Sequence, residues 1–304
     1  MKNSLVAILV LAIVSIPGIG FGEFSISLWK GETYSFRQRV TNPGAAWDSA
    51  QIRIVSPSWT NVPAGFVAKA GVLESVKTSE YPGSADYLLK PDVVKWHGSC
   101  SLRGKESSVV VGQLTASSEI AAGEYVMFFN GEKVTVRVVD RTLPPVAERR
   151  YFLDLWQHPW AVARYFGVAP FSEEHYARMR PLWTELAQAG QRTITTTILD
   201  KPWNHQCQDA YGTMIRRIKH DDGSWTFDYT LFDDYVAFCR SCGLGPDICC
   251  YTMVPGGDRV NWENESGETV YATVIAGTIE YEEYWGAFLA DFTHHLAEKG
   301  WLNN

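Results

Sequence analysis

The sequence predicts a multidomain chain of β plus α/β class: an N-terminal β-sandwich, then the first part of a (β/α)8 TIM barrel, about three βα units. Three observations support this prediction. Short β-rich segments separated by turn residues fill residues 23–143, whereas strand-like and helix-like patterns alternate in residues 151–304. Residues 144–150 form the predicted linker, because Pro144 and Pro145 cannot donate to a β-ladder.

The first segment, residues 1–22, has the pattern of a signal peptide. Lys2 supplies a positive charge, residues 5–14 are apolar, and small residues precede a cleavage point before Glu23. An uncleaved membrane anchor is the alternative, but the apolar run is short and Pro17 interrupts it. We therefore expect a secreted protein, periplasmic or extracellular, with no stable membrane span after cleavage.

The β-rich half contains six strand-like segments. They are FSISLW, TYSFRQRV, AQIRIV, SVVVGQL, GEYVMFF and KVTVRVV. Asn130-Gly131 stands between the last two, and this dipeptide favours a tight hairpin turn. The number of short strands and the spacing of the turns are typical of a sandwich.

The second half begins with a strand predicted at residues 151–156. A helix follows over residues 172–190, with Ser172 as its N-cap and Gly190 as its C-terminal cap. The remaining predicted elements follow in chain order: a strand at 192–199, a hairpin turning at Asp222-Gly223, a helix at 231–243, a strand at 247–254, a long loop at 255–278 and a helix at 279–300. A doubly wound sheet is the alternative to a barrel, but no glycine-rich phosphate fingerprint opens the first helix.

Composition excludes some partners. Of the 304 residues 46% are hydrophobic and 20% charged, as in an ordinary globular protein, and the net charge is −7. Removing residues 1–22 removes one lysine and no acid, which leaves −8. A chain this acidic does not suit nucleic acid. Cys239 and Cys242 form a CxxC, but no second such pair completes a zinc site, so we expect no metal and no cofactor.

Polar and aromatic side chains gather where the three predicted strands end. In a (β/α)8 barrel the active site lies at these C-terminal ends. Aromatic rings stack on the apolar face of a sugar, while amide, imidazole and amine groups bond its hydroxyls. The candidate substrate-binding residues are Asp154, Trp156, Gln157, His158, Lys201, Trp203 and Tyr251, with His205 in the same loop as Trp203. For each the alternative is a structural role, as a packed aromatic or a bonded polar group.

Several long motifs then resemble those of a known family. They are DRTLPP, FLDLWQHPWAVARYFGV, EEHYARMRPLWTELAQAGQ, DKPWN, DGSWTFDYTLFDDYVAF and YEEYWGAFLADFTHHLAEKGW. In this order they resemble the bacterial glycoside hydrolases of family 123, over most of residues 135–302. The resemblance implies a β-sandwich before a (β/α)8 catalytic barrel. It also implies removal of terminal β-linked N-acetylgalactosamine, with the 2-acetamido oxygen of the substrate as nucleophile and an adjacent Asp-Glu pair as supporting acids.

The sequence departs from that family at the catalytic pair. The resemblance places the pair after the helix at 279–300, and no Asp-Glu dipeptide occurs in residues 151–304. We expect the pair to lie beyond Asn304, so that the chain is an incomplete copy of the enzyme. A non-catalytic carbohydrate-binding or relic protein is the alternative. A different glycosidase on the same scaffold would need two other carboxylates, and Asp154 and Asp200 are the only candidates.

Overall fold

The computed structural model describes residues 24–42, 53–79, 87–203, 207 and 209–302. The proposed signal peptide and His205 lie outside the described residues. The chain divides into two compact units, Met1–Pro145 and Val146–Asn304. Among the described residues, no helix combines the length and the apolar character needed to cross a membrane.

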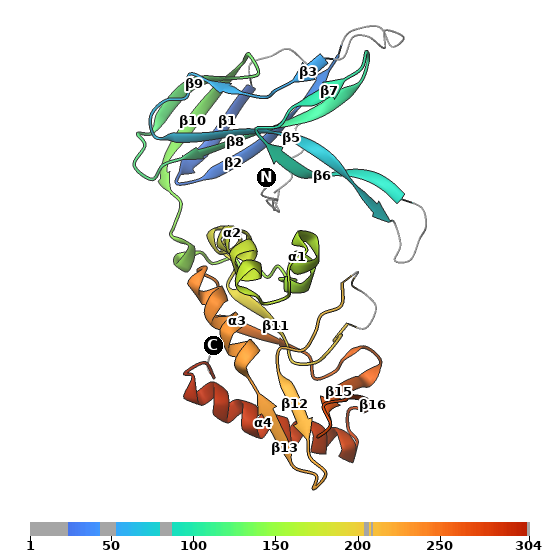
Figure 1. The fold of residues 1–304 in the computed structure, drawn as a ribbon. Helices are drawn as coiled ribbons and strands as arrows, with labels where there is room; N and C mark the ends of the chain where they lie inside the picture. The colour runs from blue at the N-terminus through green and yellow to red at the C-terminus, as the bar shows by residue number, and fades with distance from the viewer. Residues whose placement is uncertain (1–23, 43–52, 80–86, 204–206, 208, 303–304) are drawn as a thin grey trace. The chain divides into compact units, whose positions relative to one another are not determined.

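The first unit contains only strands among its described residues (Figure 1). One four-stranded sheet has the order β1-β10-β9-β4, and another has the order β2-β8-β5-β6. The strands are β1 (Phe24–Lys30), β2 (Thr33–Thr41), β3 (Arg53–Val55), β4 (Trp59–Thr60), β5 (Phe66–Ser79), β6 (Tyr87–Trp96), β7 (Cys100–Leu102), β8 (Ser107–Ala116), β9 (Gly123–Phe129) and β10 (Glu132–Thr142). The strands β3 and β7 form a separate pair.

Both of these four-stranded sheets contribute to one hydrophobic core. Leu28 of β1 and Val136 of β10 come from one sheet, and Leu114 of β8 comes from the other. All three are at most 1% exposed, as expected where alternate side chains of two sheets face each other. The hairpin predicted at Asn130-Gly131 is confirmed: it joins β9 to β10, and both residues have the positive φ that a type I′ turn requires.

The second unit mixes helices and strands. Its helices are α1 (Pro159–Phe166), α2 (Glu173–Ala189), α3 (Thr230–Ser241) and α4 (Ile279–Glu298), with short 3-10 turns η1 (Val146–Glu148) and η2 (Gly256–Asp258). Its strands are β11 (Thr193–Thr197), β12 (Arg216–Lys219), β13 (Trp225–Asp228), β14 (Asp247–Tyr251), β15 (Arg259–Glu263) and β16 (Thr269–Thr273). β11 and β14 pair in parallel, and the other four form a sheet of order β13-β12-β15-β16.

The helix predicted at residues 172–190 is confirmed as α2, and its ends show why. Ser172 Oγ accepts from the amide of His175 at 3.2 Å, and Gly190 adopts the left-handed conformation that ends the helix. The helices α3 and α4 and the hairpin β12–β13 also lie where the sequence places them.

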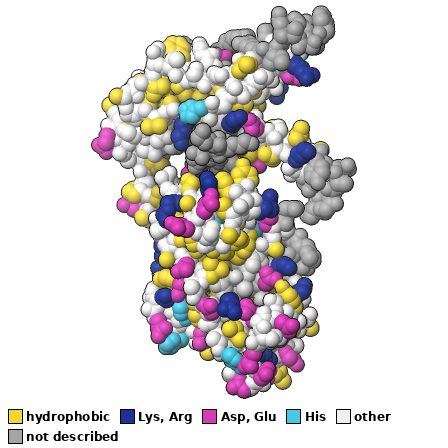
Figure 2. Space-filling model, in the orientation of Figure 1, with side chains coloured by type: hydrophobic (Ala, Val, Ile, Leu, Met, Phe, Trp, Pro, Cys, Tyr) yellow, Lys and Arg dark blue, Asp and Glu magenta, His cyan; other side chains and the backbone are white. Residues whose placement is uncertain are grey.

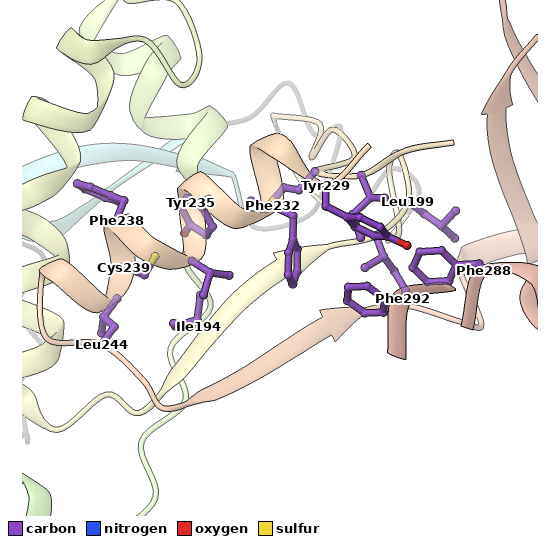
Figure 3. Packing of buried hydrophobic residues seen from close by; sticks show 14 of the residues in the cluster. Ile194, Leu199, Tyr229, Phe232, Tyr235, Phe238, Cys239, Leu244, Phe288 and Phe292 are labelled. Atoms are coloured by element: carbon purple, nitrogen blue, oxygen red, sulfur yellow. The ribbon is translucent and has the colours of Figure 1, made fainter. Parts of the chain in front are cut away.

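The core of the second unit joins α3, β11 and α4. Figure 3 shows Phe232 and Tyr235 of α3 beside Ile194 of β11, with Phe292 of α4 in the same cluster. All but Phe292 are fully buried, and Phe292 is 5% exposed. Burying a large apolar side chain contributes about 1.5–3 kcal/mol, so this cluster contributes strongly to the stability of the unit.

Two predictions for the second unit are wrong. Residues 151–156 form no strand: only Leu153 makes a bridge, to Gln191. The helix α1, for which the sequence analysis gives no element, follows this segment. The predicted loop at 255–278 contains the antiparallel hairpin β15–β16. The parallel pairings in the described part of the unit are β11 with β14, the bridge at Leu153 and a single residue pair between β12 and β15, and the barrel stays a prediction.

Candidate functional site

Two buried glutamines replace the missing β-ladder of the first predicted strand. Gln157 is 2% exposed: its amide nitrogen donates to the carbonyls of Leu155 (2.5 Å) and Thr193 (3.3 Å), and its oxygen accepts from the amide of Thr195 (2.7 Å). Gln191, 1% exposed, accepts from the amide of Leu155 (2.7 Å) and donates to the carbonyl of Thr193 (2.7 Å). Side-chain amides therefore hold residues 153–157 against β11.

This tether brings three aromatic rings together. The rings of Trp156 and Trp203 stack with centroids 5.1 Å apart, and Tyr251 lies 4.9 Å from Trp156 and 4.7 Å from Trp203. The three come from the segment after Leu153, the loop after β11 and the end of β14. Trp156 remains 54% exposed, so one large indole surface is open to a ligand. We call these three residues the aromatic cluster.

Tyr211, which is not among the residues predicted from the sequence, packs against the aromatic cluster from the buried side. It is 5% exposed, its ring lies 4.6 Å from that of Trp203, and its hydroxyl donates to the carbonyl of Gln157 (3.3 Å). Burial raises its pKa, so the hydroxyl stays protonated. Because Tyr211 follows a run of polar residues, only its aromatic type and its place beyond DKPWN could have indicated it.

His158 orients the start of α1. Its ring stacks on Tyr211 with centroids 3.6 Å apart. Its Nδ1 accepts from the amide of Ala161 (3.4 Å), and its Nε2 faces the carbonyl of Asp209 at 3.0 Å. A carbonyl only accepts, so Nε2 carries the proton and the imidazole is neutral. Burial lowers its pKa and favours the same state. Both ring nitrogens are thus occupied by backbone groups.

Asp154 is the acid beside the cluster. It is partly exposed, and its Oδ1 accepts from Gln191 Nε2 at 3.4 Å. Burial raises the pKa of Tyr251, as do the hydrogen bond with Cys249 and the negative charge of Asp154. Tyr251 therefore offers a protonated hydroxyl next to a carboxylate, a combination that can both donate to and accept from a polar ligand.

The other predicted residues lie outside the aromatic cluster. Lys201 is exposed, its amide donates to the carbonyl of Tyr211 (2.8 Å), and its Nζ lies 3.9 Å from Asp200 Oδ2. The side-chain amide of Gln157 is used by the backbone, as described above. The described residues hold no group of three or more histidine, cysteine or acidic side chains placed to bind a metal ion.

The comparisons with known proteins concern the family and the fold. Residues 156–304 match the family model described as glycoside hydrolase 123, catalytic domain. The chain is a glycoside hydrolase family 123-like protein. Its fold is similar to a solved family 123 glycoside hydrolase from Clostridium perfringens, determined to detail glycolipid glycan hydrolysis. That similarity has a TM-score of 0.76 at 22% identity, over 92% of this chain.

This family 123-like chain spans about half of the Clostridium perfringens protein, 52% of its length. No curated protein sequence matches the chain. At this identity the similarity shows a shared fold and no more. The described residues of this chain form a β-rich fold with several sheets and four α-helices. All three residues of the aromatic cluster fall within the matched range: Trp156 is its first residue, and Trp203 and Tyr251 follow later in the sequence.

Proposed function

We propose that the aromatic cluster binds the sugar of a glycan substrate. The observation that carries this proposal is the open indole surface of Trp156, held beside Trp203 and Tyr251 by buried hydrogen bonds. A flat apolar surface packs against the C–H face of a pyranose, and the neighbouring Tyr251 hydroxyl and Asp154 carboxylate suit its hydroxyl groups. The rings converge from successive segments, as ligand sites do at strand ends of α/β folds.

We propose further that the second unit corresponds to the first part of a (β/α)8 barrel, with a β-sandwich before it. The substrate in this proposal is terminal β-linked N-acetylgalactosamine, cleaved with help from the acetamido group of the substrate. That reaction needs an Asp-Glu pair, and the printed sequence contains no such dipeptide. Hydrolysis by this mechanism therefore requires a polypeptide that supplies the pair.

The absent dipeptide favours a second candidate, a carbohydrate-binding protein without catalysis. Both candidates require glycan binding at the aromatic cluster, and they differ in turnover. A chromogenic β-N-acetylgalactosaminide separates them: release of the chromophore by the purified chain, abolished in Trp156→Ala, supports the enzyme. Binding with no release supports the carbohydrate-binding protein.

Isothermal titration calorimetry with a β-methyl glycoside of N-acetylgalactosamine tests binding itself. Losing a stacking surface removes about 0.5–1.5 kcal/mol beyond the buried area, so Trp156→Ala is expected to weaken binding by about tenfold or more. Trp29→Ala is the matched control, since Trp29 is 37% exposed but belongs to the first unit. Equal affinity of wild type and Trp156→Ala would reject the site.

Export is the remaining proposal. Residues 1–22 act as a cleaved signal peptide in this proposal, which rests on their sequence pattern alone. N-terminal sequencing of the protein expressed with this leader in a bacterial host tests it. A mature N-terminus at Glu23 in the exported fraction supports cleavage, whereas Met1 on cytoplasmic protein contradicts it.

A further inference from the structure

A hollow lies beside the sheet β13-β12-β15-β16. Its volume is about 220 Å³, and its lining includes Asp200, Arg216, Asn261, Glu263, Thr269 and Tyr271. Asp200 follows β11, and the other five residues belong to β12, β15 and β16. We call this hollow the hairpin pocket.

The register of the hairpin places these side chains together. Asn261 pairs with Tyr271 and Glu263 pairs with Thr269 across β15 and β16. Residues paired directly across two strands, and residues two apart on one strand, share a face of the sheet. Arg216 reaches the same face from β12, where its guanidinium contacts Glu263 at 2.7 and 3.1 Å. The loop after β11 joins this face, since the amide of Asp200 donates to Asn261 Oδ1 at 2.9 Å.

The ionised side chains on the open face of the hairpin pocket have partners within the protein. Arg217, which also lines the pocket, is 3% exposed, and its guanidinium lies over aromatic rings of α4. Arg216 binds Glu263, and the Tyr271 hydroxyl donates to Asp200 Oδ2 at 2.7 Å. The Arg216 guanidinium lowers the pKa of Glu263, so this pair stays ionised at neutral pH. The guanidinium of Arg259 lies over the Tyr271 ring, 4.0 Å from its centroid. A free ion would have to break one of these pairs, so a neutral ligand suits the pocket better.

Several polar groups in the pocket lining have no hydrogen-bond partner among the described residues. Two of them, Nε and Nη2 of Arg217, are buried. Asp200 Oδ1, Asn261 Nδ2 and Thr269 Oγ1 are an acceptor, a donor and a hydroxyl that can do both. All three residues are at least partly exposed, so these groups are open to a ligand. This set matches the hydroxyl groups of a sugar, and Tyr271, 39% exposed, adds an aromatic surface.

The hairpin pocket is close to the aromatic cluster along the chain. Asp200 precedes Trp203 by three residues, and three residues of extended chain span at most roughly 11 Å. We propose that the hairpin pocket is a second sugar subsite, which binds a neighbouring sugar of a glycan whose terminal sugar lies on the aromatic cluster. The inference rests on the proposed function, because it assigns a longer neutral glycan to the same site.

Calorimetry of the full chain tests the subsite with two ligands, the β-methyl glycoside of N-acetylgalactosamine and a β-linked disaccharide that ends in the same sugar. Thr269→Val removes one hydroxyl at constant shape and is expected to weaken disaccharide binding by about two- to tenfold, with monosaccharide binding unchanged. Thr273→Val is the matched control, because Thr273 is exposed on the same strand but is not part of the pocket lining. Asp200→Asn is the second variant, with the same expected selectivity.

The outcomes separate this inference from the proposed function. A selective loss of disaccharide affinity in Thr269→Val and Asp200→Asn, absent in Thr273→Val, supports the subsite. The subsite is refuted if both sugars bind the wild type and neither pocket variant changes the affinity ratio. Equal losses for both sugars refute it as well. If the wild type binds neither sugar, the proposed function fails and the subsite fails with it. Unchanged melting temperatures confirm that each variant is folded.

Discussion

Gln157→Glu tests whether the buried amide holds residues 153–157 against β11. A carboxylate has almost the same shape and can still accept from the amide of Thr195. It cannot donate to the carbonyls of Leu155 and Thr193, which the Gln157 amide nitrogen now reaches. The ionised side chain would face two carbonyl oxygens in a site that is 2% exposed, so it must either destabilise the fold or bind a proton.

The magnitude follows from the pKa of the new glutamate. An unperturbed glutamate titrates at about 4.3, and burial beside two acceptors is expected to raise its pKa in the folded state by roughly two units. Each unit corresponds to about 1.4 kcal/mol. Because the folded pKa is raised, the deficit is small below pH about 4.3 and grows as the pH rises through the folded pKa. At pH 7 the variant is expected to be about 3 kcal/mol less stable than the wild type.

Urea denaturation followed by tryptophan fluorescence, at pH 4.5 and pH 7, measures this difference. Comparing each variant with the wild type at the same pH removes the contribution of all other groups. Gln188→Glu is the matched control, because Gln188 is exposed on α2 and its replacement should change the free energy of unfolding by no more than about 0.5 kcal/mol. A deficit for Gln157→Glu that is equal at both pH values, or absent at pH 7, would refute the proposed tether.

Three further predictions concern single groups. Ser172→Ala should lower the free energy of unfolding by about 1 kcal/mol, because the N-terminus of α2 loses its capping bond; an unchanged urea midpoint would contradict this. Burial lowers the pKa of His175, so the free energy of unfolding should fall as the pH drops below about 6.5, where the unfolded imidazole binds a proton. An NMR titration of the folded protein should give a His175 pKa below that value; a pKa at or above it would contradict the prediction. Burial raises the pKa of Cys250 to about 11, so iodoacetamide at pH 8 should modify Cys207 before Cys250, and faster labelling of Cys250 would contradict this prediction.

The helix α2 was predictable because its signals are local. α2 has a serine cap, acids in its first turn and a glycine after its last turn, all within its own sequence. α1 has Pro159 at its first position and Gly167 after its last turn, but it has only eight residues and no acid in its first turn. Its cap is His158, a residue that rarely takes this role. Polar and apolar residues alternate in β15 and β16 on either side of a turn at Gly267. The many polar residues around that turn made the segment look like a loop.

The first predicted strand shows what local reasoning cannot supply. Its alternation is strand-like, yet its hydrogen bonds come from the side chains of Gln157 and Gln191, more than 30 residues apart in the chain. The candidate site was predictable in part, because residue type is visible in the sequence. The aromatic residues at strand ends stood out by type, and the structure brings Trp156, Trp203 and Tyr251 together. The support from Tyr211 depends on tertiary packing that no local pattern encodes.

Saturation-transfer NMR tests the central claim most directly, that the aromatic cluster holds a sugar. Aromatic protons of the full chain are irradiated in the presence of the β-methyl glycoside of N-acetylgalactosamine, and transfer to the sugar ring protons is recorded. Binding on the indole of Trp156 predicts strong transfer to the protons of one sugar face, lost in Trp156→Ala and retained in Trp29→Ala. Absence of transfer in the wild type, or equal transfer in Trp156→Ala, would contradict the account.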